Sequence, residues 1–320
     1  MRFIFTSPLN PNHPLSTVLA KSGDGVSTVS FLVEDCRHTH STAVSRGAAL
    51  VSEPQLLQDE DGSAWVGSIK IYGDTVHTFV QIVDYTGPYL PGFRRVTSVD
   101  PLESITESPN LLTIDHMVGN QPDLEMTPVV EKYEALLDFH RFWSVDDSMI
   151  HTSYSSLRSI VVSDFDEIIK MPINEPANGF RKSQIQEFVE YYGGPGIQHI
   201  ALRSENIIHS VSMLRDRGVD FLPIPDSYYD NMREKLKSAT ITVAEDIDTL
   251  QRLRILIDYD EGGYLLQLFT KPLEDRPTLF LEVIQRRNHN GFGAGNFKAL
   301  FECIERQQDE RGNLTITDQQ

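Results

Sequence analysis

The sequence predicts an α+β fold made of repeated units, each with a β-strand, an α-helix and then several strands. The stretch that starts at Gly25 aligns without a gap with the stretch that starts at Gly196, and Gly47 and Gly218 fall at the same place in both. In each copy a strand rich in β-branched residues leads through an acidic turn into an amphipathic helix, and the glycine follows the end of that helix. A related strand opens at Leu111. These similarities indicate a chain built from several copies of one module.

The N-terminal part, residues 1–105, is expected to hold an incomplete, metal-free pair of these units. Only one short strand, around Phe3–Phe5, precedes the strand at Gly25, whereas a complete pair needs roughly another half-domain upstream. A truncated isoform and an incomplete gene model would both produce this pattern. Pro101 and the run Ser108-Pro109-Asn110 are typical of a linker, and they place a domain boundary near residue 105.

The C-terminal part, residues 106–320, is expected to form a second and larger domain. The strand at Leu111 is followed by Thr127-Pro128, which is typical of the start of a helix. Near the C-terminus, the glycine-rich run Gly291–Gly295 leads into a predicted helix over residues 296–307 with an apolar stripe along one side.

The composition is that of a globular protein, and its charge argues against several classes of partner. Apolar residues make up 40% of the 320 residues, which is enough for a sizeable core. The net charge of −18, without a block of Lys and Arg, argues against nucleic acid and anionic membranes. An anionic small molecule would need a local cation. Two cysteines are too few for a disulfide framework, and no apolar run reaches the length of about 18 residues that spans a membrane. We therefore expect a cytoplasmic protein.

Three polar residues interrupt apolar strand sequences and form a candidate metal site. His116, His199 and Glu282 are separated by equal intervals along the chain. A lone histidine in a strand is most often a packed or edge residue, and a lone glutamate usually faces solvent. Three together at matching points of repeated units favour a shared metal, because an unpaired buried carboxylate is costly. Two histidines and one carboxylate are typical of non-haem Fe(II) oxygenases and leave positions for a keto acid and O2. Thr28 stands at the position of His199 in the N-terminal copy, so we expect no metal there.

Long motifs around these residues resemble the 4-hydroxyphenylpyruvate dioxygenases of the vicinal-oxygen-chelate superfamily, the animal enzymes in particular. The matching segments are DHMVGNQP, FHRFWSVDD, LRSIVV, MPINEPA, KSQIQEFV, GIQHIAL, GYLLQLFTKP, DRPTLFLEVIQR and GFGAGNF. The similarity runs from about Phe3 to Thr315, and it implies that the family's N-terminal segment is missing. It also implies tandem βαβββ (glyoxalase-like) modules that form two open barrels, the N-terminal one incomplete, and a C-terminal lid helix.

The resemblance assigns site roles residue by residue. His116, His199 and Glu282 match the metal ligands, which implies one Fe(II) per chain. Neutral polar residues of the catalytic pocket are matched by Gln184, Gln198, Gln267, Asn174 and Ser159. The residues that contact the substrate are matched by Pro172, Phe269, Phe280, Phe292, Asn296 and Phe297. Without the resemblance, we would expect the glutamines on a solvated face and the phenylalanines in an ordinary core.

The function implied by the resemblance is an Fe(II)-dependent dioxygenase of tyrosine and phenylalanine catabolism. It converts 4-hydroxyphenylpyruvate and O2 to homogentisate and CO2, and a homodimer is expected. One alternative is an oxygenase like 4-hydroxymandelate synthase, which shares the substrate and the three ligands but oxidises the benzylic carbon. Another is a truncated, non-catalytic isoform that binds a partner or ligand. The intact ligand set argues against lost chemistry.

Overall fold

The computed structural model describes residues 1–145, 156–177 and 182–312. Its helices are α1 (Pro14–Ser22), α2 (Cys36–Ser45), α3 (Met126–Leu137), α4 (Gln184–Tyr192), α5 (Ile207–Asp216), α6 (Asp226–Leu236), α7 (Ile247–Leu253) and α8 (Phe297–Glu310). Its strands are β1 (Thr28–Leu32), β2 (Ala49–Asp59), β3 (Gly62–Tyr72), β4 (Thr75–Ile82), β5 (Leu111–Asn120), β6 (His140–Val145), β7 (Ser156–Ser163), β8 (Lys170–Ala177), β9 (Gly196–Ser204), β10 (Leu256–Tyr259), β11 (Tyr264–Phe269) and β12 (Phe280–Arg287).

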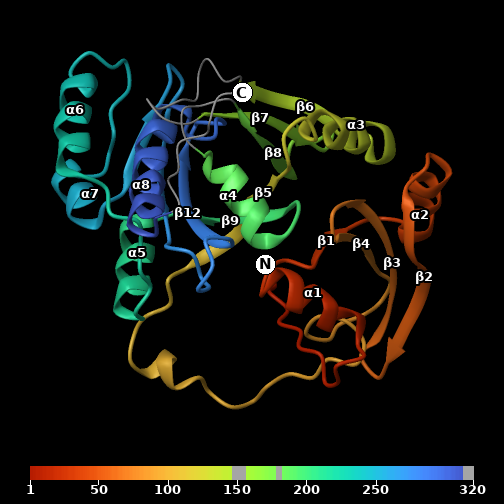
Figure 1. The fold of residues 1–320 in the computed structure, drawn as a ribbon. Helices are drawn as coiled ribbons and strands as arrows, with labels where there is room; N and C mark the ends of the chain where they lie inside the picture. Colours follow the sequence, from red (N-terminus) through yellow and green to blue (C-terminus); the bar gives the residue numbers. More distant parts are fainter. Residues whose placement is uncertain (146–155, 178–181, 313–320) are drawn as a thin grey trace.

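The strands form two curled sheets, which confirms the α+β class and the repeated unit (Figure 1). The smaller sheet has the order β1-β4-β3-β2, and the larger one has the order β10-β11-β12-β9-β5-β8-β7-β6. In each unit the first strand pairs in parallel with the last: β1 with β4, β5 with β8, and β9 with β12. The antiparallel pair β5–β9 joins two units into the eight-stranded sheet. The larger sheet is therefore two βαβββ modules side by side, and the smaller sheet is one.

The prediction of a strand around Phe3–Phe5 is wrong. Residues 1–13 contain no strand, and the side chain of Phe5 is 95% exposed. A strand needs a partner, and the smaller sheet pairs β1 only with β4. The helix α1 was not predicted; His13 caps it by accepting a hydrogen bond from the backbone N–H of Leu15.

One hydrophobic core joins the smaller sheet to the larger one. Phe31 and Phe79 from β1 and β4 belong to the same buried cluster as Tyr133 of α3 and Ile173 of β8. His77 of β4 lies inside this core, where its Nε2 is 2.7 Å from the hydroxyl of Tyr133. The boundary predicted near residue 105 falls in the connection from β4 to β5, and the division into two domains stays a prediction.

Each module uses its last strand to cap its own helix. The first N–H groups of a helix have no partner within it. In the smaller sheet, Gln81 Oε1 accepts from the backbone N–H of Cys36 at 3.1 Å. In the last module, Gln285 Oε1 accepts from the N–H of Ile207 at 2.8 Å. The middle module uses a carboxylate for the same purpose, since Glu175 accepts from the N–H of Met126 at 3.0 Å.

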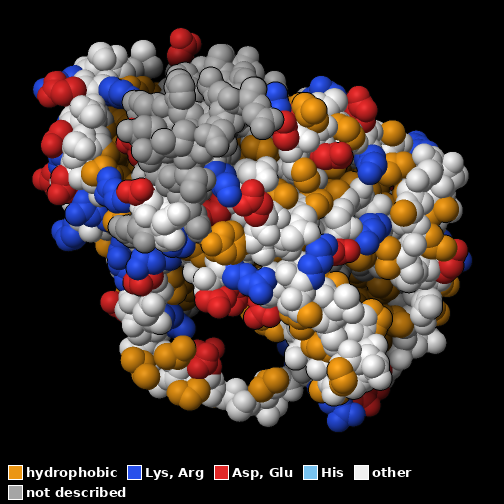
Figure 2. All heavy atoms as spheres, viewed as in Figure 1, with side chains coloured by type: hydrophobic (Ala, Val, Ile, Leu, Met, Phe, Trp, Pro, Cys, Tyr) orange, Lys and Arg blue, Asp and Glu red, His pale blue; other side chains and the backbone are white. Residues whose placement is uncertain are grey.

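The surface is consistent with the acidic composition. On the face shown in Figure 2, Lys and Arg side chains lie interspersed with Asp and Glu rather than gathered in one patch. Within residues 1–145, 156–177 and 182–312, no helix is long and apolar enough to cross a membrane.

Candidate metal centre and substrate pocket

The three predicted ligands meet at the centre of the larger sheet. His116 lies on β5, His199 on β9 and Glu282 on β12, which are three neighbouring strands. Glu282 Oε2 is 3.3 Å from the Nε2 atom of each histidine, and all three side chains are buried. One potential ligand atom from each residue lies within 4.8 Å of the others. Among the described residues, this is the one group of three or more His, Cys, Asp or Glu side chains arranged to hold a metal.

The equal spacing of the three residues in the sequence has two different structural origins. His116 and His199 both lie on the first strand of a module, so their interval is that of the repeat. Glu282 lies on the last strand of the same module as His199, where it is opposite Ala201 in the parallel pair β9–β12. The interpretation of all three as equivalent points of a repeat is therefore wrong for Glu282. The module contributes ligands from two of its strands.

The electrostatics of the centre differ between the two histidines. Burial would raise the pKa of Glu282, but the charge of and hydrogen bond from His116 hold that pKa below its usual value. Burial would lower the pKa of His116, but Glu282 and Asp115 raise it above its usual value. For His199 burial prevails and lowers the pKa, and the charge of His116 lowers it as well, although Glu282 acts in the opposite direction. Glu282 is therefore an ionised carboxylate in a buried site.

The residue before each histidine fixes the orientation of its ring. Asp115 Oδ1 is 2.8 Å from Nδ1 of His116, and Gln198 Oε1 is 3.0 Å from Nδ1 of His199. Both oxygens can only accept, so each Nδ1 carries a hydrogen, and each Nε2 faces Glu282, where a bound cation would take the place of a proton. Metal-binding histidines are commonly held in this way.

These residues fit a divalent cation. The two Nε2 atoms and one carboxylate oxygen converge, and the described part of the chain provides no Lys or Arg partner for Glu282. Imidazole and carboxylate in this combination suit Fe(II) and its first-row neighbours. A bound cation would satisfy the buried carboxylate and both imidazoles at once.

The predicted polar residues of the pocket are all buried, so the alternative that the glutamines lie on a solvated face is wrong. Ser159 and Asn174 are opposite each other on β7 and β8. Gln267 lies on β11, and Gln184 is the first residue of α4. The Oε1 atoms of Gln184 and Gln267 have no hydrogen-bond partner among the described residues, as expected of groups that await a ligand.

The predicted aromatic residues surround the histidines. Phe280 stacks on His199 with ring centroids 4.8 Å apart, and Phe269 meets the same histidine edge-on at 6.0 Å. Phe292 meets His116 edge-on at 5.1 Å. Pro172 is buried on β8. These rings form an apolar wall around the ligand set.

The predicted lid residues are only partly visible. Asn296 is fully buried; its Oδ1 lies 2.7 Å from the hydroxyl of Tyr228, and its Nδ2 has no partner among the described residues. Helix α8 covers Phe297–Glu310, three residues beyond the predicted end. The side chain of Phe297 lies outside the described part of the structure, so its predicted contact with the substrate stays a prediction.

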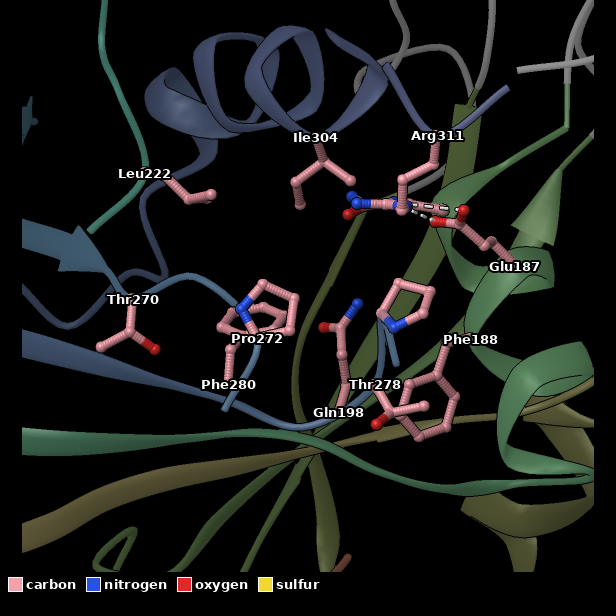
Figure 3. Close-up of a pocket in the computed structure, with 12 residues that line it drawn as sticks. Glu187, Phe188, Gln198, Leu222, Thr270, Pro272, Thr278, Phe280, Ile304 and Arg311 are labelled. Carbon is pink, nitrogen blue, oxygen red and sulfur yellow. Dashed lines mark hydrogen bonds and ion pairs between the residues drawn. The ribbon is translucent and has the colours of Figure 1, made fainter. Parts of the chain in front are cut away.

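A pocket lies between α4, α8, β9 and β12 (Figure 3). It is lined by the predicted residues Gln184, Gln198 and Phe280, and Ile304 points into it from α8. At its upper edge Arg311 forms an ion pair with Glu187 at 2.9 Å, and Arg311 and Glu187 were not predicted. Asp115 and Arg286, which lie beside the metal centre, were not predicted either. The signal available for Asp115 was its place before His116, which matches the place of Gln198 before His199.

Known proteins resemble the chain over most of its length. Residues 113–268 match the family model described as Glyoxalase/Bleomycin resistance protein/Dioxygenase superfamily. Proteins named 4-hydroxyphenylpyruvate dioxygenase from Xenopus tropicalis and Danio rerio are each 58% identical over 316 residues, or 98% of this chain and 80% of the relative. The protein of that name from Dictyostelium discoideum is 55% identical over 97% of this chain and 85% of its own. A solved triple mutant of 4-hydroxymandelate synthase from Streptomyces coelicolor is 31% identical with a TM-score of 0.78, covering 94% of this chain and 82% of that one.

Proposed function

The chain belongs to the 4-hydroxyphenylpyruvate dioxygenase family, and from this premise we propose that His116, His199 and Glu282 hold one Fe(II) at its active site. The reaction is the conversion of 4-hydroxyphenylpyruvate and O2 to homogentisate and CO2, a step of tyrosine and phenylalanine catabolism. The observation that carries the proposal is the ionised, buried Glu282 with both histidine Nε2 atoms at 3.3 Å. An iron ion, when bound, supplies reactivity with O2 and open positions for the keto acid.

The charge of the centre suits an anionic substrate. The protein as a whole carries a charge of −18 and repels anions at a distance. At the centre, the three ligands contribute a single negative charge, so a divalent cation leaves one positive charge to attract the substrate carboxylate. Arg286 adds nothing to this balance, because Asp115 neutralises it.

The aromatic and amide side chains orient the substrate. Phe269 and Phe280 lie beside His199 with their rings nearly perpendicular to each other, and they offer apolar faces to a phenyl ring. The unpartnered Oε1 atoms of Gln184 and Gln267 can accept a hydrogen bond from a phenol. Neutral amides suit this place, because additional carboxylates would compete for the metal. The buried wall also keeps water away from the reacting atoms.

The proposal is tested by loading the metal-free protein with Fe(II) under anaerobic conditions and then adding 4-hydroxyphenylpyruvate and O2. We expect one iron per chain and one homogentisate and one CO2 for each O2 consumed. Iron bound at a different stoichiometry, or consumption of O2 without an aromatic product, would contradict the proposal.

A second candidate activity is 4-hydroxymandelate formation, favoured by the likeness to the solved 4-hydroxymandelate synthase. Homogentisate and 4-hydroxymandelate are isomers, so their masses cannot distinguish them. Chromatography with fragmentation against both standards gives the answer. The sequence identity of 58% to relatives named as dioxygenases supports homogentisate.

The location and assembly of the protein are further parts of the proposal. A cytoplasmic enzyme is supported by two free, buried cysteines, Cys36 and Cys303, which suit a reducing compartment. A homodimer is proposed from the family resemblance, and light scattering on the purified protein tests it.

A further inference from the structure

We propose that Arg286, which is outside the ligand set, is a positioning residue for the metal centre. It holds Asp115 in the orientation that fixes the ring of His116, and it connects this ligand to the segment that precedes α8. The inference rests on the proposed function, because it concerns the same metal centre.

The contact between Arg286 and Asp115 is a buried, two-point pair. Arg286 Nε donates to Asp115 Oδ2 at 2.9 Å, and Nη2 donates to Oδ1 at 2.8 Å. The two side chains are only 10% and 7% exposed. Such a fork fixes both the position and the rotation of a carboxylate, which a single ammonium group does not.

The fixed carboxylate controls His116. Asp115 Oδ1 receives the Nδ1–H of His116 at 2.8 Å in addition to its bond from Arg286. If the fork is lost, Asp115 keeps one hydrogen bond in place of three and is free to turn. That rotation removes the acceptor that keeps Nε2 of His116 directed at Glu282.

The same guanidinium holds the glycine-rich segment. Arg286 Nη1 donates to the backbone carbonyl of Gly291 at 2.5 Å and to that of His289 at 3.1 Å. The guanidinium carbon of Arg286 lies 5.5 Å from the centre of the Phe292 ring, and this ring meets His116 edge-on. One side chain therefore positions both a ligand and the aromatic wall beside it. His199 has no such arrangement in the described structure, because its Nδ1 partner is the amide of Gln198.

The experiment measures Co(II) binding to the metal-free chain, by calorimetry and by the visible absorption bands of the bound ion. The variants are Arg286→Lys, which keeps the charge but not the fork, Asp115→Asn, and the two combined. The matched control is Arg287→Lys on the opposite face of the same strand, where Arg287 pairs with Glu205 and is 43% exposed. We expect Arg286→Lys and Asp115→Asn each to weaken Co(II) binding by about 10-fold to 100-fold and to alter the absorption bands. The double variant should bind Co(II) no more weakly than the single variant with the lower affinity, because both substitutions act through one contact.

Three results would overturn the inference: Co(II) affinity of Arg286→Lys within about twofold of the parent, losses that add in the double variant, or an equal loss in Arg287→Lys. If Arg286→Lys does not fold, Asp115→Asn decides, and parental affinity in the folded protein would overturn the inference. A parent chain that binds no Co(II) would instead refute the metal centre itself, so the two failures are distinguishable.

Discussion

The N-terminal module and the last module share the same strand pairing and helix cap, but they carry different side chains on the other face of the last strand. Both place the first strand parallel to the last, and both cap the helix with a glutamine from the last strand, Gln81 in one and Gln285 in the other. Three residues before that glutamine, the last module has the proposed ligand Glu282, whereas the N-terminal module has Thr78, whose hydroxyl lies 2.8 Å from that of Ser68.

The middle module extends the comparison. Its capping residue is Glu175, and three residues before it stands Pro172, a residue without a ligand atom. Of the proposed ligands, the middle module contributes His116 from its first strand and none from its last. Pro172 thus offers no ligand atom at the position equivalent to Glu282, and we expect this open position to suit a centre that binds a substrate and O2.

The difference teaches that framework and chemistry occupy opposite faces of the same strand. Residues that face the helix, such as Phe79 and Val283, belong to hydrophobic clusters, and the cap lies on that side as well. Residues on the other face can change from threonine to proline to glutamate without disturbing the cap. Four predictions test this separation, beginning with the largest expected effect.

Replacing Glu282 with Gln should abolish turnover and weaken metal binding by at least about 100-fold, because a neutral amide cannot replace the anionic ligand. Metal content after dialysis and the rate of O2 uptake measure the two effects. The matched variant Thr78→Val should change neither. Full metal retention by Glu282→Gln would remove Glu282 from the ligand set.

Replacing Pro172 with Glu should place a carboxylate at the open position of the middle module. We expect the metal to be retained, because a ligand is gained, and turnover to fall by about tenfold or more, because substrate and O2 lose a position. The neutral variant Pro172→Gln separates charge from size. Parental turnover in Pro172→Glu would show that residue 172 is not equivalent to Glu282.

The buried histidine of the N-terminal module should make folding stability depend on pH. Burial lowers the pKa of His77 to about 4 in the folded chain, against about 6.5 when unfolded. Between these values the unfolded chain binds more protons, so stability is full above about pH 6.5 and falls as the pH drops towards 4. We expect a loss of about 2 kcal/mol at pH 5 relative to pH 7 from this group. Urea unfolding at both pH values measures the loss, and His77→Phe should lack it. If the parent and His77→Phe lose the same free energy of unfolding between pH 7 and pH 5, His77 is not the group responsible.

The two caps should contribute similar, small amounts. Gln81→Ala and Gln285→Ala each leave the first helical N–H without its acceptor, which costs about 1 kcal/mol and lowers the melting temperature by about 2–4 °C. Calorimetry measures both shifts, and Gln81→Glu, which keeps an acceptor, should retain most of the stability. Gln285→Ala loses a further bond to Glu245 and should show the larger shift. A Gln81→Ala variant as stable as the parent would show that this cap contributes nothing.

Much of the fold could be predicted because its units repeat. The alignment at Gly25 and Gly196 predicted two of the three modules, and the helix start at Thr127-Pro128 lies within one residue of the observed Met126. The pairing of strands could not be predicted in detail. In sequence, residues 78–81 resemble residues 264–267, which would match Gln81 with Gln267, but the parallel register makes Gln285 its counterpart. Similarity between short alternating strands does not identify which edge of the sheet they occupy.

Site residues could be predicted where a polar side chain interrupts an apolar strand, and they were missed where it does not. A charged or titratable residue in an apolar strand is visible in the sequence, and His116, His199 and Glu282 meet as expected. Arg286 lies next to Arg287 at the end of β12, so nothing in the sequence distinguished one from the other. Only the three-dimensional contact with Asp115 reveals the difference, because that contact joins strands that are far apart in the chain.

The support of the three ligands by hydrogen-bonded neighbouring strands affects how the protein obtains its metal. Strands in a sheet stand about 4.8 Å apart, and this spacing already holds the ligand atoms within reach of one ion. Loading therefore requires no refolding, unlike a zinc finger, which is unstructured until it binds its ion. A rigid site with two imidazoles and one carboxylate also accepts other first-row ions and binds several of them more tightly than iron. We therefore expect the supply of ions where the chain matures to set the identity of the bound metal, and a protein produced in a medium rich in cobalt, nickel or zinc should fold normally and carry the wrong metal.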